Sequence, residues 1–343
     1  MTKILKQVAG IDVAQDELVV SLGRLDQSLR KEVYAYKTFA NKTSGFGALL
    51  VWVKKHSDHG AAVRYIMEAT GIYHEKLAYY LSDQGFEVSI VLPNKISSYM
   101  KTLDIKTITD KTASQAICQF GLERSLDLWQ KPKKIFKDLK QLTRERDQIV
   151  TDRIVAKNQL HAEQAEAFPN DRSIYRANQR IKLLNEQERE IKKEIAEFVK
   201  TDKDLHKKID LITSVSGVGS LTAVITIAET NGFDLIKNKK QLVSFAGLDV
   251  ISKDSGTSVK GKPRISKKGN RHLRKAMHMP ALAAIRNDER FKAIFVRLVS
   301  KHGIKMKAAV AVQRKILEMI YTIWKTGKPY DKEYLQKVNA TLV

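Results

Sequence analysis

The stretch QVAGIDVAQDELVVSLGRL at residues 7–25 decides the fold of the first part of this chain. Apolar residues dominate positions 8–13 and again positions 17–25, and the residues between them, 14–16, suit a tight turn. The two runs are therefore predicted to be neighbouring antiparallel strands. Residues 33–39 repeat the strand pattern and extend the pair to a three-stranded meander.

Downstream of the meander the pattern alternates between helix and strand. Helical periodicity covers residues 44–56 and 73–84, and strand-like runs cover residues 63–68 and 87–91. Three meander strands followed by alternating helices and strands is the element order of the ribonuclease-H-like fold. Residues 1–130 are thus predicted to form an α/β domain of this class, although a fold by itself does not specify a function.

Residues 131–212 are rich in charged, helix-favouring side chains and poor in glycine. Two apolar stripes at helical spacing predict two long helices, the second reaching Ile212, and Arg146 and Arg153 interrupt the first stripe. The FPND sequence at residues 168–171 breaks the pattern between them. We expect an antiparallel coiled-coil hairpin that serves as a spacer or as an arm for dimerisation.

Residues 213–343 are predicted to form a third, mainly helical domain. It opens with SGVGS at residues 216–220, which leads into an apolar helix at 221–229. Gly217 and Gly219 resemble the turn of helix-hairpin-helix modules, whose backbone N–H groups meet a phosphate. A tight turn that only packs the helix closely is an equal alternative. The further helices are expected at residues 239–246, 270–286, 288–301 and 306–324.

The charge of the chain predicts a polyanionic partner. There are 61 Lys and Arg against 38 Asp and Glu, a net charge of +23. Residues 260–275 carry eight of these cations and no acid, a density that favours contact with nucleic-acid phosphates. The cations of this basic segment are Lys260, Lys262, Arg264, Lys267, Lys268, Arg271, Arg274 and Lys275.

Other features bound the location of the protein. No apolar run approaches the roughly 18 residues that a membrane helix needs, and the N-terminus does not resemble a signal peptide. The single cysteine, Cys118, excludes an internal disulfide and a Cys-rich zinc site, and we expect it to be buried. The expected location is the cytoplasm, without contact to a membrane.

Acidic residues at the ends of predicted strands suggest a metal site. Asp12 and Glu68 each stand where a strand ends, and Asp110 lies in the helical segment after the last strand, with Asp104 as its competitor. Converging carboxylates can hold Mg²⁺, which prefers oxygen ligands and stabilises the charge of phosphoryl transfer. The alternative for each acid alone is a turn cap or a surface ion pair.

Ser255 is the candidate nucleophile. It lies in a Ser-Gly loop beside the basic segment, where a hydroxyl could reach and attack a phosphodiester. A covalent phosphoserine would conserve the bond energy needed to rejoin strands. The alternative is an ordinary turn, in which Ser-Gly is common.

Taken together, these motifs resemble the DEDD transposases of the insertion-sequence-110 class, which are relatives of the Piv invertases. The resemblance covers nearly the whole chain, and RISKKGN at residues 264–270 is its most specific part. The remaining matching segments are GIDV at 10–13, MEATGIY at 67–73, and residues 106–115, 214–219, 245–247, 255–256 and 273–274.

The resemblance implies a RuvC-like domain with four acids that bind Mg²⁺, a coiled-coil arm, and a transposase domain whose serine attacks DNA. Carried over by position, three acids fall on Asp12, Glu68 and Asp110, and the nucleophile falls on Ser255. It also implies a structured noncoding bridge RNA that pairs with donor and target duplexes, so that base pairing reads the sequence. Dimers that pair into tetramers are expected, because the two active parts come from different subunits.

The fourth acid is missing. The family pattern Thr-Asp-x-x-Asp aligns with residues 109–113 and places Ala113 where the last aspartate belongs. Loss of one ligand implies weakened metal binding and phosphoryl transfer, with nucleic-acid binding retained. The chain is then a catalytically impaired form, through either a deliberate substitution or natural decay.

Two other functions fit the same residues. One is a metal-dependent junction nuclease that cuts with the carboxylates and leaves Ser255 idle. The other is a noncatalytic nucleic-acid-binding protein, which Ala113 and the high positive charge would suit. A covalent protein–DNA adduct that disappears on Ser255→Ala favours recombination over both.

Overall fold

The computed structural model describes residues 3–69, 71–103, 105, 107–252, 254–255, 259–261, 263–331 and 333, with backbone only at 254–255 and 259–260. The chain forms two compact units, Met1–Lys131 and Pro132–Val343. Within the described ranges, no helix is both long and apolar enough to cross a bilayer.

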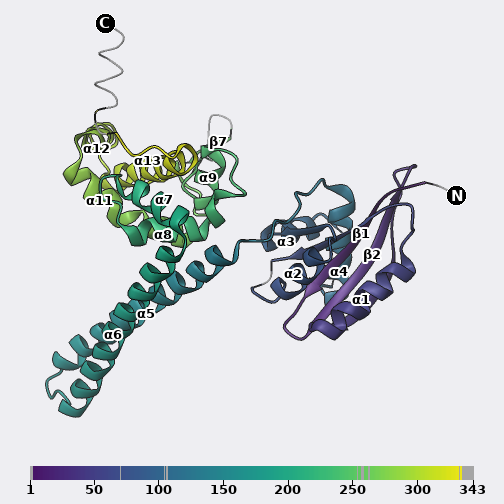
Figure 1. Ribbon diagram of the computed structural model, residues 1–343, viewed down its shortest axis with the longest axis horizontal. Helices are drawn as coiled ribbons and strands as arrows, with labels where there is room; N and C mark the ends of the chain where they lie inside the picture. Colours follow the sequence, from purple (N-terminus) through teal and green to yellow (C-terminus); the bar gives the residue numbers. More distant parts are fainter. Residues whose placement is uncertain are drawn as a thin grey trace, which may run out of the picture. The chain divides into compact units, whose positions relative to one another are not determined.

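A five-stranded sheet organises the first unit, in the order β3-β2-β1-β4-β5 (Figure 1). Strand β2 is antiparallel to β1 and β3, whereas β4 is parallel to both β1 and β5. The predicted meander and α/β units are thus confirmed, and the sheet order fits a ribonuclease-H-like, RuvC-like domain. The strands are β1 (Ile4–Val13), β2 (Glu17–Asp26), β3 (Lys31–Ala40), β4 (Val63–Glu68) and β5 (Val88–Val91).

Helices cover both faces of this sheet, because strand side chains alternate between the two faces. Ala9 and Ile11 pack with apolar residues of α1 and α2, whereas Val8 and Ile66 pack with α3 and α4. Cys118 of α4 is buried, as predicted. The helices of this unit are α1 (Thr43–His56), α2 (Glu75–Asp83), α3 (Pro93–Met100) and α4 (Asp110–Glu123).

Gly10 lets α4 approach β1 unusually closely. A Cβ atom at this position would lie 2.3 Å from the backbone nitrogen of Cys118 and 2.6 Å from the carbonyl oxygen of Ser114. Any other residue would push the helix away from the strand. The glycine of the GIDV motif therefore sets the distance between the strand and the helix that carry Asp12 and Asp110.

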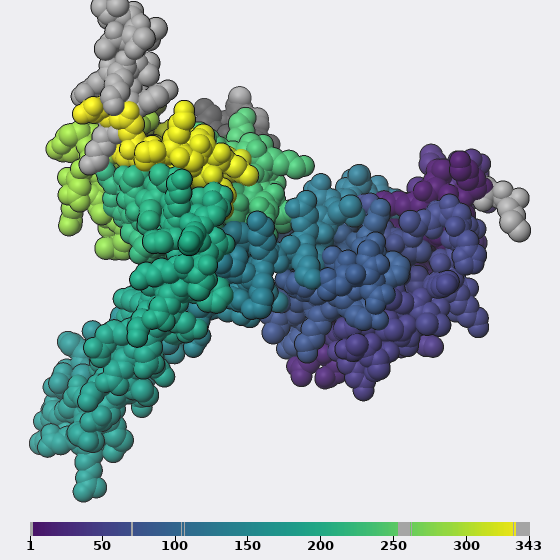
Figure 2. Space-filling model, in the orientation of Figure 1, coloured from purple at the N-terminus to yellow at the C-terminus, as the bar shows by residue number. Residues whose placement is uncertain are grey.

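Two long helices open the second unit, α5 (Lys134–Gln164) and α6 (Asp171–Thr201), and they pack along each other in opposite directions (Figure 1). Figure 2 shows the far end of the pair standing clear of the rest of its unit, and Phe168 in the connecting turn is 95% exposed. The prediction that the second helix reaches Ile212 was wrong. Asp202 ends α6 and caps a separate helix, α7 (Lys203–Thr213), by accepting a hydrogen bond from the Leu205 N–H.

The two arginines that interrupt the apolar stripe of α5 have a common partner on α6. Arg146 and Arg153 both bond Glu188, which is only 5% exposed. Burial alone would raise the pKa of Glu188, but hydrogen bonds from Lys192 and the two arginines outweigh it and lower the pKa to about 2. The interruption of the stripe is thus a buried ionic contact that fixes the register of the two helices.

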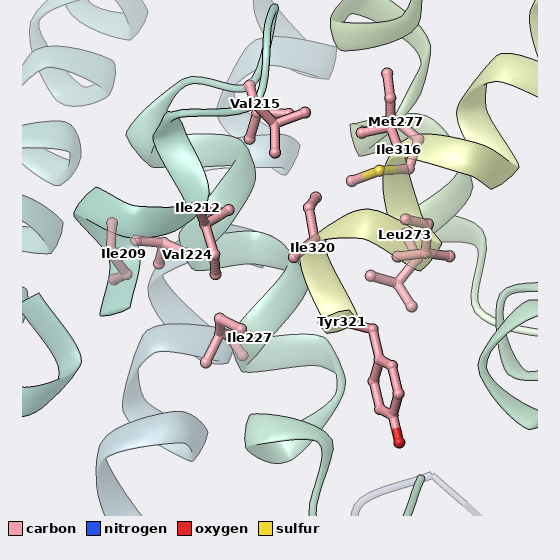
Figure 3. Packing of buried hydrophobic residues seen from close by; sticks show 14 of the residues in the cluster. Ile209, Ile212, Val215, Val224, Ile227, Leu273, Met277, Ile316, Ile320 and Tyr321 are labelled. Carbon is pink, nitrogen blue, oxygen red and sulfur yellow. The ribbon is translucent and has the colours of Figure 1, made fainter. Parts of the chain in front are cut away.

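The rest of the second unit is a helical bundle around α13 (Lys305–Thr326). Ile316 and Ile320 of this helix are fully buried; Ile316 lies beside Met277, and Ile320 lies on the side of Ile212 and Ile227 (Figure 3). The other helices are α8 (Ser220–Glu229), a short 3₁₀ helix (Asn231–Phe233), α9 (Lys239–Ala246), α10 (Arg271–Ala276), α11 (His278–Asn287) and α12 (Glu289–His302).

The single helix predicted at residues 270–286 was also wrong. The structure divides it at Met277 into α10 and α11. Pro280, in the first turn of α11, has no N–H with which to continue a helical ladder across the junction. Two short strand pairs were not predicted at all: β6 (Val250–Ile251) with β9 (Arg264–Ile265), and β7 (Asp254–Ser255) with β8 (Val259–Lys260).

Candidate active site

Asp12 and Glu68 lie side by side on one face of the sheet. The parallel register of β1 and β4 pairs Ile11 with Met67, so Asp12 and Glu68 are the next residues on the two strands. By the alternation of side chains they share the face of Val8 and Ile66, which is the face that α4 covers. The predicted placement of both acids at strand ends is confirmed.

Helix α4 brings Asp110 to the same end of the sheet. The Ser114 hydroxyl lies 2.8 Å from that of Ser21, which is paired with Gly10, and Gly121 packs against Val8. The helix therefore runs antiparallel to β1, and Asp110, one turn before Ser114, lies toward Asp12. A capping box between Thr109 and Thr112 fixes the start of the helix at Asp110.

The charges of Asp110 and Glu68 act electrostatically on Asp12. Burial raises the pKa of Asp12 to about 6, and the charges of Asp110 and then Glu68 add to the rise, against a hydrogen bond from the Val13 N–H. Within the described residues, however, no three His, Cys, Asp or Glu side chains converge closely enough to hold an ion. Asp104, the competitor of Asp110, lies outside the described residues.

Ala113 stays the predicted position of the missing fourth acid. It is three residues after Asp110 on α4, and residues at this spacing share a helix face. Its methyl group offers no ligand. Carboxylate oxygens are the ligands that a hard divalent cation prefers, and the charge of a bound cation would offset the charges of Asp110 and Glu68 that raise the pKa of Asp12.

The raised pKa of Asp12 leads to a prediction about stability. Between about pH 4 and pH 6 Asp12 is largely ionised in the unfolded state but still largely protonated in the folded state. The free energy of unfolding therefore falls as the pH rises through this range, and the loss is complete by pH 7. In EDTA, Asp12→Asn should therefore raise the free energy of unfolding by about 1–3 kcal/mol at pH 7 and by much less near pH 4. Urea denaturation at the two pH values measures the difference.

A suitable control is Asp16→Asn, because Asp16 is exposed in the turn between β1 and β2. This variant should leave the stability nearly unchanged at both pH values. An equal gain from Asp12→Asn near pH 4 and at pH 7 would contradict the electrostatic explanation.

Ser255 belongs to the second unit, in the β7–β8 pair. Its backbone is paired with that of Val259, and the structure describes the side chains of neither Ser255 nor Lys260. Lys262 lies outside the described residues. The pairing shows that the serine stands in a short antiparallel strand pair whose second strand includes Lys260, the first cation of the basic segment.

The basic segment is partly exposed and partly engaged within the protein. Arg264, Lys267, Lys268 and Arg271 are exposed, as contact with phosphates would require. By contrast, Nη1 of Arg274 donates to the carbonyl oxygens of Ala246 (2.8 Å) and Gly269 (3.1 Å). The next cation, Lys275, bonds Asp147 of α5 at 2.5 Å. The last two cations therefore also hold α10 in place.

The two glycines before α8 differ in their surroundings. Gly217 has φ +84°, and a Cβ there would lie 2.5 Å from the carbonyl oxygen of Pro280. Close packing against α11 thus explains this glycine. Gly219 has no atom within 4 Å of a built Cβ and is exposed at the start of α8. A phosphate contact at this turn stays a prediction.

Sequence reasoning missed a buried network that anchors the basic segment. Glu229, at the end of α8, accepts hydrogen bonds from Arg144 Nε and Nη2 (2.8 and 3.0 Å) and from Asn270 Nδ2 (2.6 Å). Asn270 in turn caps α10 by accepting from the His272 and Leu273 N–H groups. The only signal in the sequence was an acid at the end of an apolar helix. Its partner Arg144 lies 85 residues away, which no local pattern reveals.

Comparisons with known proteins agree with this architecture. Residues 9–169 match the DEDD transposase model of the IS110 type, and residues 209–295 match the model of the transposase IS116/IS110/IS902 family. The pilin gene-inverting protein of Moraxella bovis is 27% identical over 95% of this chain and 98% of its own length. An uncharacterized 43.6 kDa protein of insertion element IS110 from Streptomyces coelicolor is 25% identical over 44% of this chain and 36% of its own length.

Among solved structures, the chain is similar to T. thermophilus RuvC in complex with a Holliday junction substrate. The match has 12% identity and a TM-score of 0.26, and covers 36% of this chain and 99% of RuvC. The family of the chain is shown by the two family models and by the full-length similarity to the pilin gene-inverting protein. The chain belongs to the IS110 family of transposases, with a DEDD domain at its N-terminus, and is a DNA-processing enzyme.

Proposed function

We propose that this transposase exchanges DNA strands through two cooperating centres. Asp12, Glu68 and Asp110 would hold Mg²⁺, and Ser255 would form a phosphoserine with the cut strand. The observation that carries the proposal is the position of Asp12 and Glu68 as neighbours at one end of the sheet, where the charges of Asp110 and Glu68 add to the burial that raises the pKa of Asp12 to about 6. Such a cluster is costly without a cation and is useful where phosphodiester charge must be stabilised.

In the proposed reaction the Ser255 oxygen forms a bond to phosphorus as the bond to a DNA oxygen breaks. The serine gives up its proton, and the departing DNA oxygen takes one up. Reversal with an oxygen from another duplex joins new partners without an external energy source. The ion would stabilise charge on the phosphate. The carboxylates of this chain position it, and exposed cations such as Arg264 and Lys268 hold the flanking backbone.

The proposed division of the chain follows its sequence. Residues 1–130 would form the RuvC-like domain, residues 131–212 a coiled-coil arm, and residues 213–343 the transposase domain. The arm would join subunits into dimers, and two dimers would form a tetramer around the donor and target duplexes. The protein would work on the nucleoid. The ionic contact of Arg146 and Arg153 with Glu188 supports a stiff arm, since it fixes the register of α5 and α6.

A structured guide RNA from the same element is the proposed source of sequence specificity. Net charge +23 exceeds what one short basic segment provides, and supports contact with more than one nucleic acid. In this division of labour the protein reads shape and backbone while base pairing reads sequence.

Sequencing the RNA that copurifies with the protein tests this part of the proposal. The protein should be expressed beside its own flanking element DNA, and one noncoding RNA with segments complementary to donor and target should be strongly enriched. A variant with Arg264, Lys267 and Lys268 changed to alanine provides the matched control, because it removes exposed cations outside the core. Protein that binds its DNA sites while carrying no enriched RNA would contradict RNA guidance.

A further inference from the structure

A cavity of about 620 Å³ lies within the Pro132–Val343 unit, between the start of α5 and the helices α8, α10, α11 and α13. This volume is within the range of about 300–1,000 Å³ typical of small-molecule pockets. A cavity of this volume can take a single nucleotide but not a base-paired duplex. The cavity contains neither Ser255 nor any of the three carboxylates.

One part of the lining is apolar and suits a flat, poorly hydrated group. Its apolar members include Leu221 and Ile225 of α8, Leu248, and Pro280 of α11. Ile225 and Thr222 line the cavity from α8 and do not belong to the bundle core. Burial of a nucleobase against such a surface is favourable, because apolar area is removed from water on both sides.

The charged part of the lining favours an anion. It contains four cations and two carboxylates. These side chains are Arg144, Arg146, Arg274 and Lys275, with Asp147 and Glu229 as the acids. Arg144 is paired with Glu229, Lys275 with Asp147 and Arg146 with Glu188 outside the lining, whereas Arg274 bonds backbone carbonyls instead of an acid. The contacts of Arg274 to the Ala246 and Gly269 carbonyls hold its guanidinium without neutralising it. Arg271, the first residue of α10, and Lys268, three residues before it, are exposed cations close in sequence to His272 of the lining.

His278 supplies a fixed hydrogen-bond donor in the same lining. The buried amide of Gln313 donates from Nε2 to His278 Nδ1 at 3.1 Å. In the neutral imidazole the proton then resides on Nε2. A donor held in one tautomer beside an apolar wall can meet an acceptor on the edge of a base, such as a carbonyl oxygen or ring nitrogen.

We propose that this cavity receives one unpaired nucleotide of a DNA strand, with its base against the apolar wall and a flanking phosphate on Arg274 and Arg271 of α10. The inference rests on the proposed function, because strand exchange exposes unpaired nucleotides that the enzyme must keep from re-pairing. Burial of an extruded base offsets the cost of unpairing it. The site would thus stabilise an opened duplex.

Binding in EDTA tests this site without any cleavage. The full-length protein is titrated with a labelled short single-stranded DNA, the matching duplex, the same strand in RNA, and a strand in which every base is replaced by an abasic tetrahydrofuran residue. The test variant Thr222→Trp fills the cavity from α8. The matched control Val296→Trp adds the same side chain at a site on α12 that is 53% exposed.

We expect Thr222→Trp to weaken binding of the intact single strand by about tenfold, to change duplex binding by less than about twofold, and to leave the abasic strand unaffected. Val296→Trp should change none of the three. His278→Leu should weaken binding of the intact strand but not of the abasic one, and it keeps the test valid if circular dichroism shows that Thr222→Trp does not fold.

Equal loss of single-strand and duplex affinity in these variants would overturn the proposal, as would unchanged binding by both folded variants. RNA binding more than about tenfold tighter than DNA binding would overturn the choice of DNA. Because the assay needs neither Ser255 nor a metal ion, its outcome is independent of whether strand exchange itself is demonstrated.

Discussion

Replacing Ala113 by aspartate should raise the rate of metal-dependent DNA cleavage and strand exchange by about 100-fold. Ala113 follows Asp110 by three residues on α4, so the new carboxylate would lie on the same helix face. It would complete a set of four acids with Asp12 and Glu68. The measurement is the yield of recombined plasmid and of cleaved strand from purified protein in Mg²⁺.

Two further results distinguish a restored metal ligand from a general increase in the stability or DNA binding of the protein. In EDTA, Ala113→Asp should destabilise the fold, because a fourth charge joins a cluster in which the pKa of Asp12 is already raised to about 6. Ala113→Asn, which has the same shape but no charge, should give little activity. If Ala113→Asp binds DNA normally and yields no additional product, a missing ligand does not explain an impaired site.

Replacing Ser255 by alanine in the Ala113→Asp protein should abolish strand exchange, with a loss of more than about 1,000-fold. No other group would then carry the strand between cutting and rejoining. Binding of duplex DNA should change by less than about twofold, since the exposed cations of the basic segment remain. Plasmid recombination and an electrophoretic binding assay measure the two properties on the same samples.

Ser258→Ala is the matched control, because it removes a hydroxyl from the same short segment of sequence. Its recombination yield should stay close to that of the parent. Metal-dependent cutting that survives Ser255→Ala at full rate would instead identify a nuclease that uses the carboxylates alone. A protein whose DNA products respond to neither Ser255→Ala nor Ala113→Asp would be a noncatalytic binder.

The architecture of the first unit could be predicted because each of its helices and strands shows a pattern of apolar residues within its own segment of sequence. Strand alternation in residues 7–25 and the helix pattern after it identify the elements, and the fold follows from their order. Asp12 and Glu68 could be placed at strand ends for the same reason. Their juxtaposition depends on the register of β1 with β4, which forms between segments more than fifty residues apart and is not readable from either strand.

The missed features of the second unit are long-range contacts. Arg146 and Arg153 appear in the sequence as defects of an apolar stripe, and only their pairing with Glu188 shows that they belong to the helix interface. The anchoring of α10 through Glu229 and Asn270 likewise depends on contacts between distant segments. The break at Asp202 was missed for another reason, since an apolar stripe at helical spacing continues across it and conceals the cap.

The most direct test of the central claim is to locate the covalent bond to DNA. The Ala113→Asp protein is incubated with labelled substrate and Mg²⁺, denatured, digested and mapped by mass spectrometry. The account predicts a DNA-linked peptide that contains Ser255 and that is lost both in EDTA and on Asp12→Asn. An adduct that forms equally well without metal or without the Asp12 carboxylate, or one attached to another residue, would contradict it.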